Sequence, residues 1–499
     1  MTARIETALA RPATHDGFDP DTELASVLGE AGIDTADTGG TITFHGADPI
    51  VPSTLRLGGA AAIALAAKSA AIAKLWRVRG GPGQDIAVDL RTAPHRLCPF
   101  YDRRWELLNG YPPAAPANPT NAFGFRFYRT ADDRWMMPLN LYPKIKVRAQ
   151  SLLGVPDTET AVAHAISRWD SAELEEAGSE AGVVMPMLRT TAELLREPHY
   201  RLALADMPLI EVTRIGDSDP EPLPFAAAPL AGVRALGMGH VIAGAGIGRA
   251  LALHGADVLN LWRPSEFEHD SAYASANVGV RSATIDPCDP DGALLIRALL
   301  TDADIFFANR RPGYLEQIGL SATEAAELRP GIIHATASLN GEHGPWASNV
   351  GFDQTAGSLT GMMLLEGGGD RPALPPILVV NDYIVSWLTT VGIVEALSRR
   401  ALVGGSYRVH VSLTRAALWI LALGIFDKDY ARTTAGVGTD HVYRDPETFT
   451  AETPLGRYQG VTDQVYMSRT PGAYSPILVP RGSCAPVWRA KPARANDPS

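Results

Sequence analysis

A chain of 499 residues exceeds the size of one ordinary hydrophobic core, so we expect two or three domains. Apolar residues make up 46% of the chain and charged residues 20%, which is the balance of a soluble globular protein. Because the net charge is -11, nothing points to nucleic acid as a partner, and an anionic ligand must be held by local cations and backbone amides.

The cysteines and histidines predict neither a disulfide framework nor a metal site. Cys98, Cys288 and Cys484 lie far apart with no CxxC pair, and the 12 histidines are scattered. The N-terminal residues lack the apolar stretch of a signal peptide. The longest candidate span, residues 376–397, contains a carboxylate that would be costly in lipid. We therefore expect a cytoplasmic protein that binds no membrane.

The first half of the chain joins polar loops to helical patterns. An alanine-rich helix is followed by a glycine turn and an alternating strand, which is a helix–turn–strand unit. The predicted elements in chain order are a helix at 21–32, a helix at 57–76, a strand at 85–90, and helices at 144–153, 158–176 and 191–197. A proline-rich stretch at 216–229 is typical of a linker.

The second half changes to alternating strands and helices with short loops. Strands are predicted at 233–238, 258–262, 305–307 and 331–334. This order predicts a doubly wound, Rossmann-like α/β fold with a parallel sheet. We divide the chain into a polar segment at 1–45, a first region at 46–225, the sheet domain at 226–430, and a C-terminal extension and tail at 431–499.

One internal repeat is visible. Residues 58–93 and 382–416 share the plan of an apolar helix, a glycine turn and an alternating strand. When Leu90 is set against Leu413, Gly59 falls on Asp382, so the first copy would lack the carboxylate of the second. Chance similarity of two alanine-rich helices is the alternative.

The turn at 244–248 contains Gly244, Gly246 and Gly248 between a strand and a helix. Such a turn presents backbone N–H groups to a phosphate, although glycines there also serve helix–sheet packing. The next strand ends in Arg263 where an NAD-binding protein would carry an acid. A guanidinium group suits a further phosphate, as in NADP or coenzyme A, unless Arg263 is simply solvated.

Two other positions could carry chemistry. Asn309, Arg310 and Arg311 follow the strand at 305–307, where loops of doubly wound folds form the ligand crevice. Asp382 stands between an apolar strand and an apolar helix. It is either an N-cap or a nucleophile whose charged form the positive helix end would favour.

From residue 229 to about 425 the chain resembles the class III CoA-transferase family, which includes formyl-CoA and carnitine CoA-transferases and acyl-CoA racemases. The resemblance is carried, in order, by residues 229–234 (PLAGVR), 240–244 (HVIAG), 253–258 (LHGADV), 309–313 (NRRPG), 315–320 (LEQIGL), 351–353 (GFD), 381–382 (ND) and 409–413 (VHVSL). Residues 58–93 and 182–199 are similar to later parts of the same family. The chain thus resembles a degenerate copy fused ahead of a second one.

The resemblance implies an acyl-CoA:carboxylate CoA-transferase. Asp382 matches the aspartate that attacks the thioester and carries the covalent intermediate. The positions that match the family's coenzyme A crevice are His240, Ile242, Ala243, Arg263, Asn309 and Arg310. The implied ligands are coenzyme A, bound as an acyl-CoA substrate, and a carboxylic acid acceptor, with no metal. The implied assembly is a homodimer.

Several residues depart from the family pattern. Trp262 replaces an acid, Val280 replaces a lysine, and Phe352 stands where racemases carry a histidine. Because Phe352 cannot move a proton, racemisation is disfavoured. Two alternatives stay open: an NADP-dependent oxidoreductase that uses the turn at 244–248, and a catalytically silent acyl-CoA-binding protein.

Overall fold

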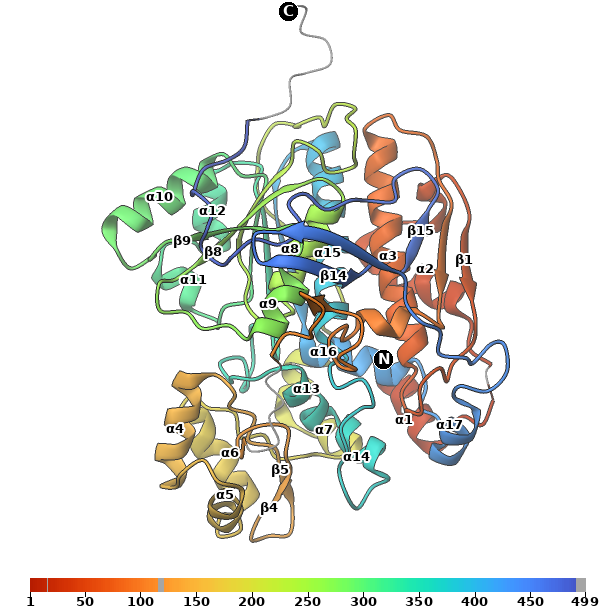
Figure 1. The fold of residues 1–499 in the computed structure, drawn as a ribbon, viewed down its shortest axis with the longest axis vertical. Coiled ribbons are helices and arrows are strands. Elements are labelled where there is room, and N and C mark those ends of the chain that lie inside the picture. Colours follow the sequence, from red (N-terminus) through yellow and green to blue (C-terminus); the bar gives the residue numbers. More distant parts are fainter. Residues whose placement is uncertain (16, 115–120, 491–499) are drawn as a thin grey trace, which may run out of the picture.

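A seven-stranded sheet forms the centre of the computed structural model, which describes residues 1–15, 17–114 and 121–490 (Figure 1). Its strands are β6 (Glu211–Gly216), β7 (Arg234–Met238), β8 (Asp257–Trp262), β9 (Arg281–Thr284), β10 (Ile305–Ala308), β11 (Ile333–Ser338) and β12 (Ser406–Ser412). The spatial order is β6-β12-β11-β10-β7-β8-β9. Strands β7 to β12 are parallel, and β6 pairs antiparallel with β12. This is the order of a doubly wound sheet, so the predicted α/β fold class is confirmed.

Helices cover both faces of this sheet. Helices α8 (Ala245–Leu253) and α15 (Asp382–Val403) lie on one face, and α10 (Pro290–Thr301) and α12 (Ala322–Leu328) lie on the other. Successive strand residues alternate between the two cores: Phe307 packs with α8 and α15, whereas Phe306 packs with α10. This two-sided burial explains why β10 is apolar throughout and why β7 and β8 are mostly apolar.

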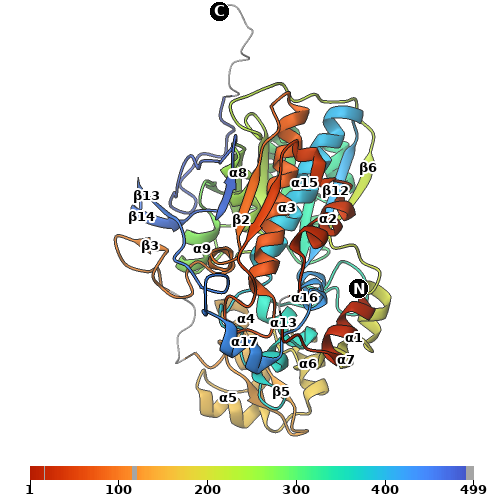
Figure 2. The same ribbon diagram turned by 90° about the vertical axis from the view of Figure 1, so that its right-hand side faces the viewer.

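The N-terminal region forms a further layer on α15. Helix α3 (Leu57–Val78) lies beside α15, as Figure 2 shows, and 19 of its 22 residues are buried. Among the described residues it is the one helix that is long and apolar enough to cross a membrane, yet 94% of its apolar window is buried inside the protein. Outside α3 lie α2 (Pro20–Ala31) and a sheet of β1 (Ile42–His45), β2 (Ile86–Asp89) and β15 (Val465–Met467).

A small lobe extends below the sheet in Figure 1. It contains β4 (Tyr128–Arg129), β5 (Trp135–Met136), α4 (Pro143–Leu153), α5 (Glu159–Ile166) and α6 (Ser171–Glu180), and it has its own apolar core. The helix predicted at 158–176 is wrong as one element, because the chain turns at Asp170. The Asp170 side chain accepts a hydrogen bond from Ala172 N at 3.0 Å and so begins α6.

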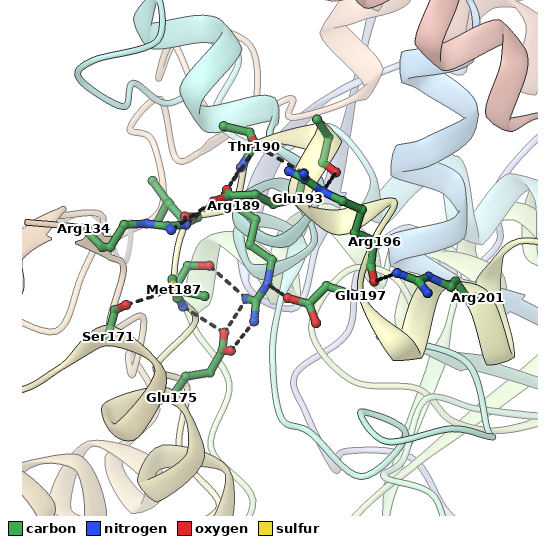
Figure 3. Close-up of polar contacts among 12 residues, drawn as sticks. Arg134, Ser171, Glu175, Met187, Arg189, Thr190, Glu193, Arg196, Glu197 and Arg201 are labelled. Carbon is green, nitrogen blue, oxygen red and sulfur yellow. Dashed lines mark hydrogen bonds and ion pairs between the residues drawn. The ribbon is translucent and has the colours of Figure 1, made fainter. Parts of the chain in front are cut away.

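Ion pairs fix the lobe against the rest of the chain, as Figure 3 shows. The buried Arg189 guanidinium contacts Glu175 of α6 at 2.5 Å and Glu197 at 2.7 Å. Arg134 contacts Glu193 of α7 (Thr191–Leu194) at 3.0 Å. Because the Arg189 guanidinium binds Glu175 inside the lobe and Glu197 outside it, the lobe has a defined orientation toward the sheet.

The predicted domain boundaries stay a prediction, and two features cross them. Strand β6 precedes the boundary at 225/226, yet it pairs with β12 as the edge of the large sheet. In the C-terminal extension, β13 (Thr448–Thr453) and β14 (Gly456–Val461) form a sheet with β3 (Leu107–Leu108) of the first half. Residues 115–120 of the predicted first region and residues 491–499 of the predicted C-terminal tail lie outside the described residues.

The remaining elements are short connections and capping helices. They are α1 (Thr2–Ala10), η1 (Thr35–Thr38), η2 (Ala93–Arg96), η3 (Tyr200–Leu204), α9 (Asp270–Ala276), α11 (Tyr314–Gln317), α13 (Asp353–Thr360), α14 (Met362–Gly367), α16 (Leu413–Ala422) and α17 (Lys428–Thr434).

Candidate active site

A cavity of about 660 Å³ lies where the carboxyl ends of β7, β8, β10 and β11 meet the small lobe. Ligands of doubly wound folds bind at this edge of the sheet. The predicted site residues that line it are His240, Ala243, Arg263, Asn309, Arg310 and Asp382. Ile242 is the exception, because it is only 3% exposed and belongs to the hydrophobic core.

Asp382 is the first residue of α15 and is 5% exposed. The N-cap position belongs to Asn381, so the interpretation of Asp382 as an N-cap is wrong. A second carboxylate occupies the helix terminus instead. Asp353 Oδ2 accepts hydrogen bonds from the backbone N–H groups of Val380 and Asp382, each at 3.0 Å, and from that of Asn381. The amides at this helix end are thus directed at Asp353.

The electrostatics of Asp382 differ from the expectation. Burial raises the pKa of Asp382 well above its ordinary value, and the nearby Asp353 charge raises it further. Burial also raises the pKa of Asp353 to about 6, although three backbone amides stabilise its charged form. The sequence-based expectation that the helix end favours a charged Asp382 is therefore wrong, because Asp353 takes that position.

Two of the predicted cations share one buried carboxylate. Arg263 Nη2 lies 3.2 Å from Glu266 Oε1, and Arg310 forms an ion pair with the same oxygen. Burial acts to raise the pKa of Glu266, but the charge and hydrogen bond of Arg310, the charge of His240 and the Arg263 amide together hold that pKa at about 2. The three side chains form a fixed charged wall, and Arg263 remains 38% exposed along its side chain.

Asn309 holds the loop that carries His240. Its side chain accepts from His240 N at 2.9 Å and donates to the His240 carbonyl at 2.8 Å. A Cβ at Gly244 would lie 2.2 Å from Asn309 Oδ1, and one at Gly246 would lie 2.5 Å from Ser386 Oγ of α15. These glycines thus serve close packing, and the three glycines of the turn are not among the cavity-lining residues.

The small lobe adds Tyr142, Lys144 and Arg148 to the cavity. The guanidinium groups of Arg148 and Arg311 both lie near Gly182, where an added Cβ would lie 3.5 Å from Arg148 and 3.3 Å from Arg311. Burial lowers the pKa of Arg311, and the like charge of Arg148 lowers it further. Within the ranges that the structure describes, Lys144, Arg148 and Arg311 have no carboxylate partner within 4 Å. They form an uncompensated positive group.

The sequence of residues 230–453 matches the model of CoA-transferase family III. This segment, which is less than half of the chain, is similar to that family. It includes every predicted site residue, whereas Tyr142, Lys144 and Arg148 of the small lobe lie outside it.

Relatives of the chain are CoA-transferases from other organisms. The succinyl-CoA–L-malate CoA-transferase alpha subunit of Chloroflexus aurantiacus is 31% identical over 227 residues, covering 42% of this chain and 53% of that protein. A succinate–glutarate CoA-transferase of Agrobacterium fabrum is 27% identical over 218 residues, covering 40% and 54%. A solved CAIB/BAIF family protein from Brucella suis is 22% identical, with a TM-score of 0.36, over 46% of this chain and 65% of that one. The chain spans about half the length of the curated relatives it matches.

Of the three residues that depart from the expected family pattern, Phe352 lines the cavity, whereas Trp262 and Val280 do not. Trp262 is buried beside Tyr273, and Val280 is buried in the hydrophobic core. Phe352 stacks on Tyr142 at 5.5 Å between ring centroids. An aromatic pair thus occupies the position at which the resemblance implies a histidine in racemases.

The sequence-based reasoning missed Glu266, Asp353 and the lobe residues. The only indication of Glu266 in the sequence was a weak one: it lies three residues after Arg263. Lys144 and Arg148 lie one helical turn apart, which indicates a basic face on α4 but not its target. Their place in the cavity depends on the lobe's orientation, which local sequence does not contain.

Proposed function

We propose that this chain is an acyl-CoA:carboxylate CoA-transferase and that Asp382 is its covalent nucleophile. The observation that carries the proposal is that a buried carboxylate at the start of α15 and five cationic side chains line the same cavity. These are Lys144, Arg148, Arg263, Arg310 and Arg311. Coenzyme A is a polyanion, so a chain of net charge -11 needs such a local group to bind it.

The proposed reaction splits the transfer into exchanges at one carboxylate. Asp382 attacks the thioester carbonyl, and the C–S bond breaks to give a mixed anhydride and the CoA thiolate. The thiolate attacks the Asp382 carbonyl, which releases the donor acid and leaves an aspartyl-CoA thioester. The acceptor carboxylate attacks that thioester to give a second anhydride, and the returning thiolate takes the new acyl group. Each step exchanges anions, so no proton is transferred.

The acceptor is inferred from the relatives and the cations. The relatives are named for succinyl-CoA with malate and for succinate with glutarate, so each acyl group or acid is that of a dicarboxylic acid. A dicarboxylate keeps one carboxylate free while the other reacts. The uncompensated charges of Lys144, Arg148 and Arg311 would suit either that group or a coenzyme A phosphate.

Replacing Arg263 with alanine should weaken coenzyme A binding by about 1–3 kcal/mol, as for the loss of a charge-assisted hydrogen bond. Arg263 stands at the strand end where the ribose phosphate of a nucleotide is expected. The loss should therefore be smaller for dephospho-CoA, measured by isothermal titration. The exposed Arg214 of β6 supplies the control, because Arg214→Ala should change neither affinity. Equal losses for the two ligands would assign Arg263 another role.

Changing Asp353 to asparagine should move the acidic limb of the kcat/KM profile to lower pH. The nucleophile acts as a carboxylate, which exists above its pKa, and the Asp353 charge raises that pKa. Removing the charge lowers the pKa of Asp382, so activity should persist at more acidic pH. Glu366, whose pKa burial raises to about 7, provides a control outside the cavity. In Glu366→Gln the acidic limb should stay in place. If it also stays in place in Asp353→Asn, the Asp353 charge does not raise the pKa of Asp382 and the prediction is refuted.

The N-terminal region is proposed to be a silent copy of the catalytic helix unit. Helices α3 and α15 each contain 22 residues. At the start of α3 the buried Asp48 accepts from Gly58 N at 3.0 Å and from Gly59 N at 2.6 Å, as Asp353 accepts at α15. These parallels support the repeat, and Gly59 supplies no nucleophile at the position that corresponds to Asp382.

Measurements of ligand binding and of turnover distinguish the proposed transferase from the two alternatives. A catalytically silent acyl-CoA-binding protein is favoured by one observation, the raised pKa of Asp382, because a protonated carboxyl is a poor nucleophile. Such a protein would bind coenzyme A without turnover. An NADP-dependent oxidoreductase would bind NADP instead, although the glycines at 244–248 pack against neighbouring side chains.

A further inference from the structure

The side chains of a serine, a histidine and a glutamate from three adjacent strands lie in a row at the wall of the cavity. Ser338, the last residue of β11, lines the cavity, and its Oγ lies 2.9 Å from His410 Nε2 of β12. On the far side of the ring, His410 Nδ1 lies 3.7 Å from Glu211 Oε2. Glu211 is the register partner of His410 on β6.

The geometry favours a defined direction of proton transfer. His410 is 2% exposed, so its two ring nitrogens face the protein and not solvent. A carboxylate beside Nδ1 favours the tautomer that carries its proton there, which leaves Nε2 free to accept the Ser338 hydroxyl proton. Burial lowers the pKa of His410, so the ring is neutral near pH 7 and Nε2 carries a free lone pair.

The charges around His410 are largely paired with one another. Arg408 Nη1 contacts Glu211 at 3.0 Å, and its Nη2 contacts Glu342. Glu342 Oε1 lies 3.9 Å from His410 Nε2 and accepts a hydrogen bond from Thr336 Oγ1 at 2.9 Å. His343 acts electrostatically to lower the pKa of His410, as Arg408 does, whereas the two glutamates raise it. Ser338 Oγ also accepts from Gly341 N at 3.0 Å, which fixes its position.

CoA transfer between carboxylates has no use for such a relay, because each of its steps exchanges anions. A reaction that consumes water must move a proton, and a serine held by a neutral histidine is suited to that task. We propose that Ser338, His410 and Glu211 form a relay that hydrolyses acyl-CoA thioesters in the same cavity. The proposal rests on the proposed function only in that the cavity accepts an acyl-CoA.

The steps balance in atoms and charge. Ser338 Oγ attacks the thioester carbonyl while its proton passes to His410 Nε2. The C–S bond breaks, and the CoA thiolate takes that proton, which leaves an acyl ester on Ser338. Water then attacks the ester and gives a proton to His410, which returns it to Ser338 Oγ. The net reaction converts acyl-CoA and water into the free acid and CoA.

The test measures CoA release with and without an acceptor acid, using the full chain. The donors are acetyl-CoA, succinyl-CoA and glutaryl-CoA, each corrected for release without protein, and the acceptor is glutarate or malate. Ser338→Ala and His410→Gln should each lower the ratio of hydrolysis to transfer by about 100-fold, which is the scale of general-base catalysis. Matched controls are Ser406→Ala, whose hydroxyl accepts from Gly331 N, and His334→Gln, a buried histidine of β11. The controls should leave the ratio unchanged.

The Asp382→Ala variant separates this proposal from the proposed function. In that variant transfer should stop, while mass spectrometry after incubation with the donors should find an acyl ester on Ser338. Hydrolysis without any transfer in the parent protein would overturn the transferase proposal alone. Three results would each overturn the relay. They are no hydrolysis by the parent protein, an unchanged ratio of hydrolysis to transfer in Ser338→Ala, and no acyl ester on Ser338 in Asp382→Ala.

Discussion

Replacing Asp382 with alanine should abolish CoA transfer, with a loss of at least about 1,000-fold in kcat, while coenzyme A affinity stays within a few-fold. The reason is chemical: in the proposed route every covalent intermediate forms on this carboxylate. The affinity should survive because the positive charges of the cavity lie on other side chains, from Arg263, Arg310 and Arg311 to the lobe residues.

The measurement combines turnover with trapping of the intermediate. Hydroxylamine added during turnover should convert Asp382 of the parent protein to a hydroxamate, which mass spectrometry locates, and should modify no aspartate of the variant. Asp370→Ala is the control, because that residue is exposed and lies outside the cavity. Titration of the intact protein should find one covalent aspartyl site per chain, since Gly59 stands at the corresponding position of the first half. Unchanged turnover in Asp382→Ala, or a second modified aspartate, would refute this assignment.

Much of the sheet and its ligand edge was predictable because both follow local rules. Strands at 233–238, 258–262 and 305–307 are short, mostly apolar runs, and the structure places β7, β8 and β10 there. Arg263, Asn309 and Arg310 follow strand ends, so parallel pairing brings them to one edge whatever the details of packing. Five of the seven predicted site residues line the cavity for this reason, and Asp382 lines it from the start of α15.

What the sequence could not supply depends on contacts between distant segments. The raised pKa of Asp382 comes first from burial and then from the charge of Asp353, which lies 29 residues earlier and takes the amides of the α15 terminus. The contribution of Lys144 and Arg148 depends on how the lobe is held by the pairs of Arg189 with Glu175 and Glu197. Ser338 and His410 are 72 residues apart and meet only because β11 and β12 pair in a register that sets Ser338 beside Ser412.

Removing residues 1–228 should give an aggregating protein and not a small active domain. Helix α15 is mostly apolar and buried nearly all round: the sheet and α8 cover part of it, α3 covers another face, and 19 of its 22 residues are buried. A helix of this kind must be enclosed on every side. The truncation would uncover the face of α15 that α3 protects, and a large exposed apolar patch drives association.

The truncation would also remove polar anchors and part of the cavity. Arg79 at the end of α3 donates to the carbonyl oxygens of Pro229 and Ala231, each at 3.0 Å or less. The buried Lys68 of α3 forms an ion pair with Asp463 near the C-terminus. Tyr142, Lys144 and Arg148 would be lost from the cavity wall. Any soluble fraction should therefore bind coenzyme A more weakly than the parent protein.

The experiment compares residues 229–499 expressed alone with the same fragment expressed together with residues 1–228. Size-exclusion chromatography should show aggregates for the fragment alone and a stoichiometric complex for the pair, because α3 can cover α15 without a covalent link. Transfer activity should return with the complex, since the lobe again supplies its side of the cavity. A soluble, monodisperse and active fragment from Pro229 onward would show that the first half is dispensable. In that case α15 would fold and hold Asp382 in place without its contact to α3.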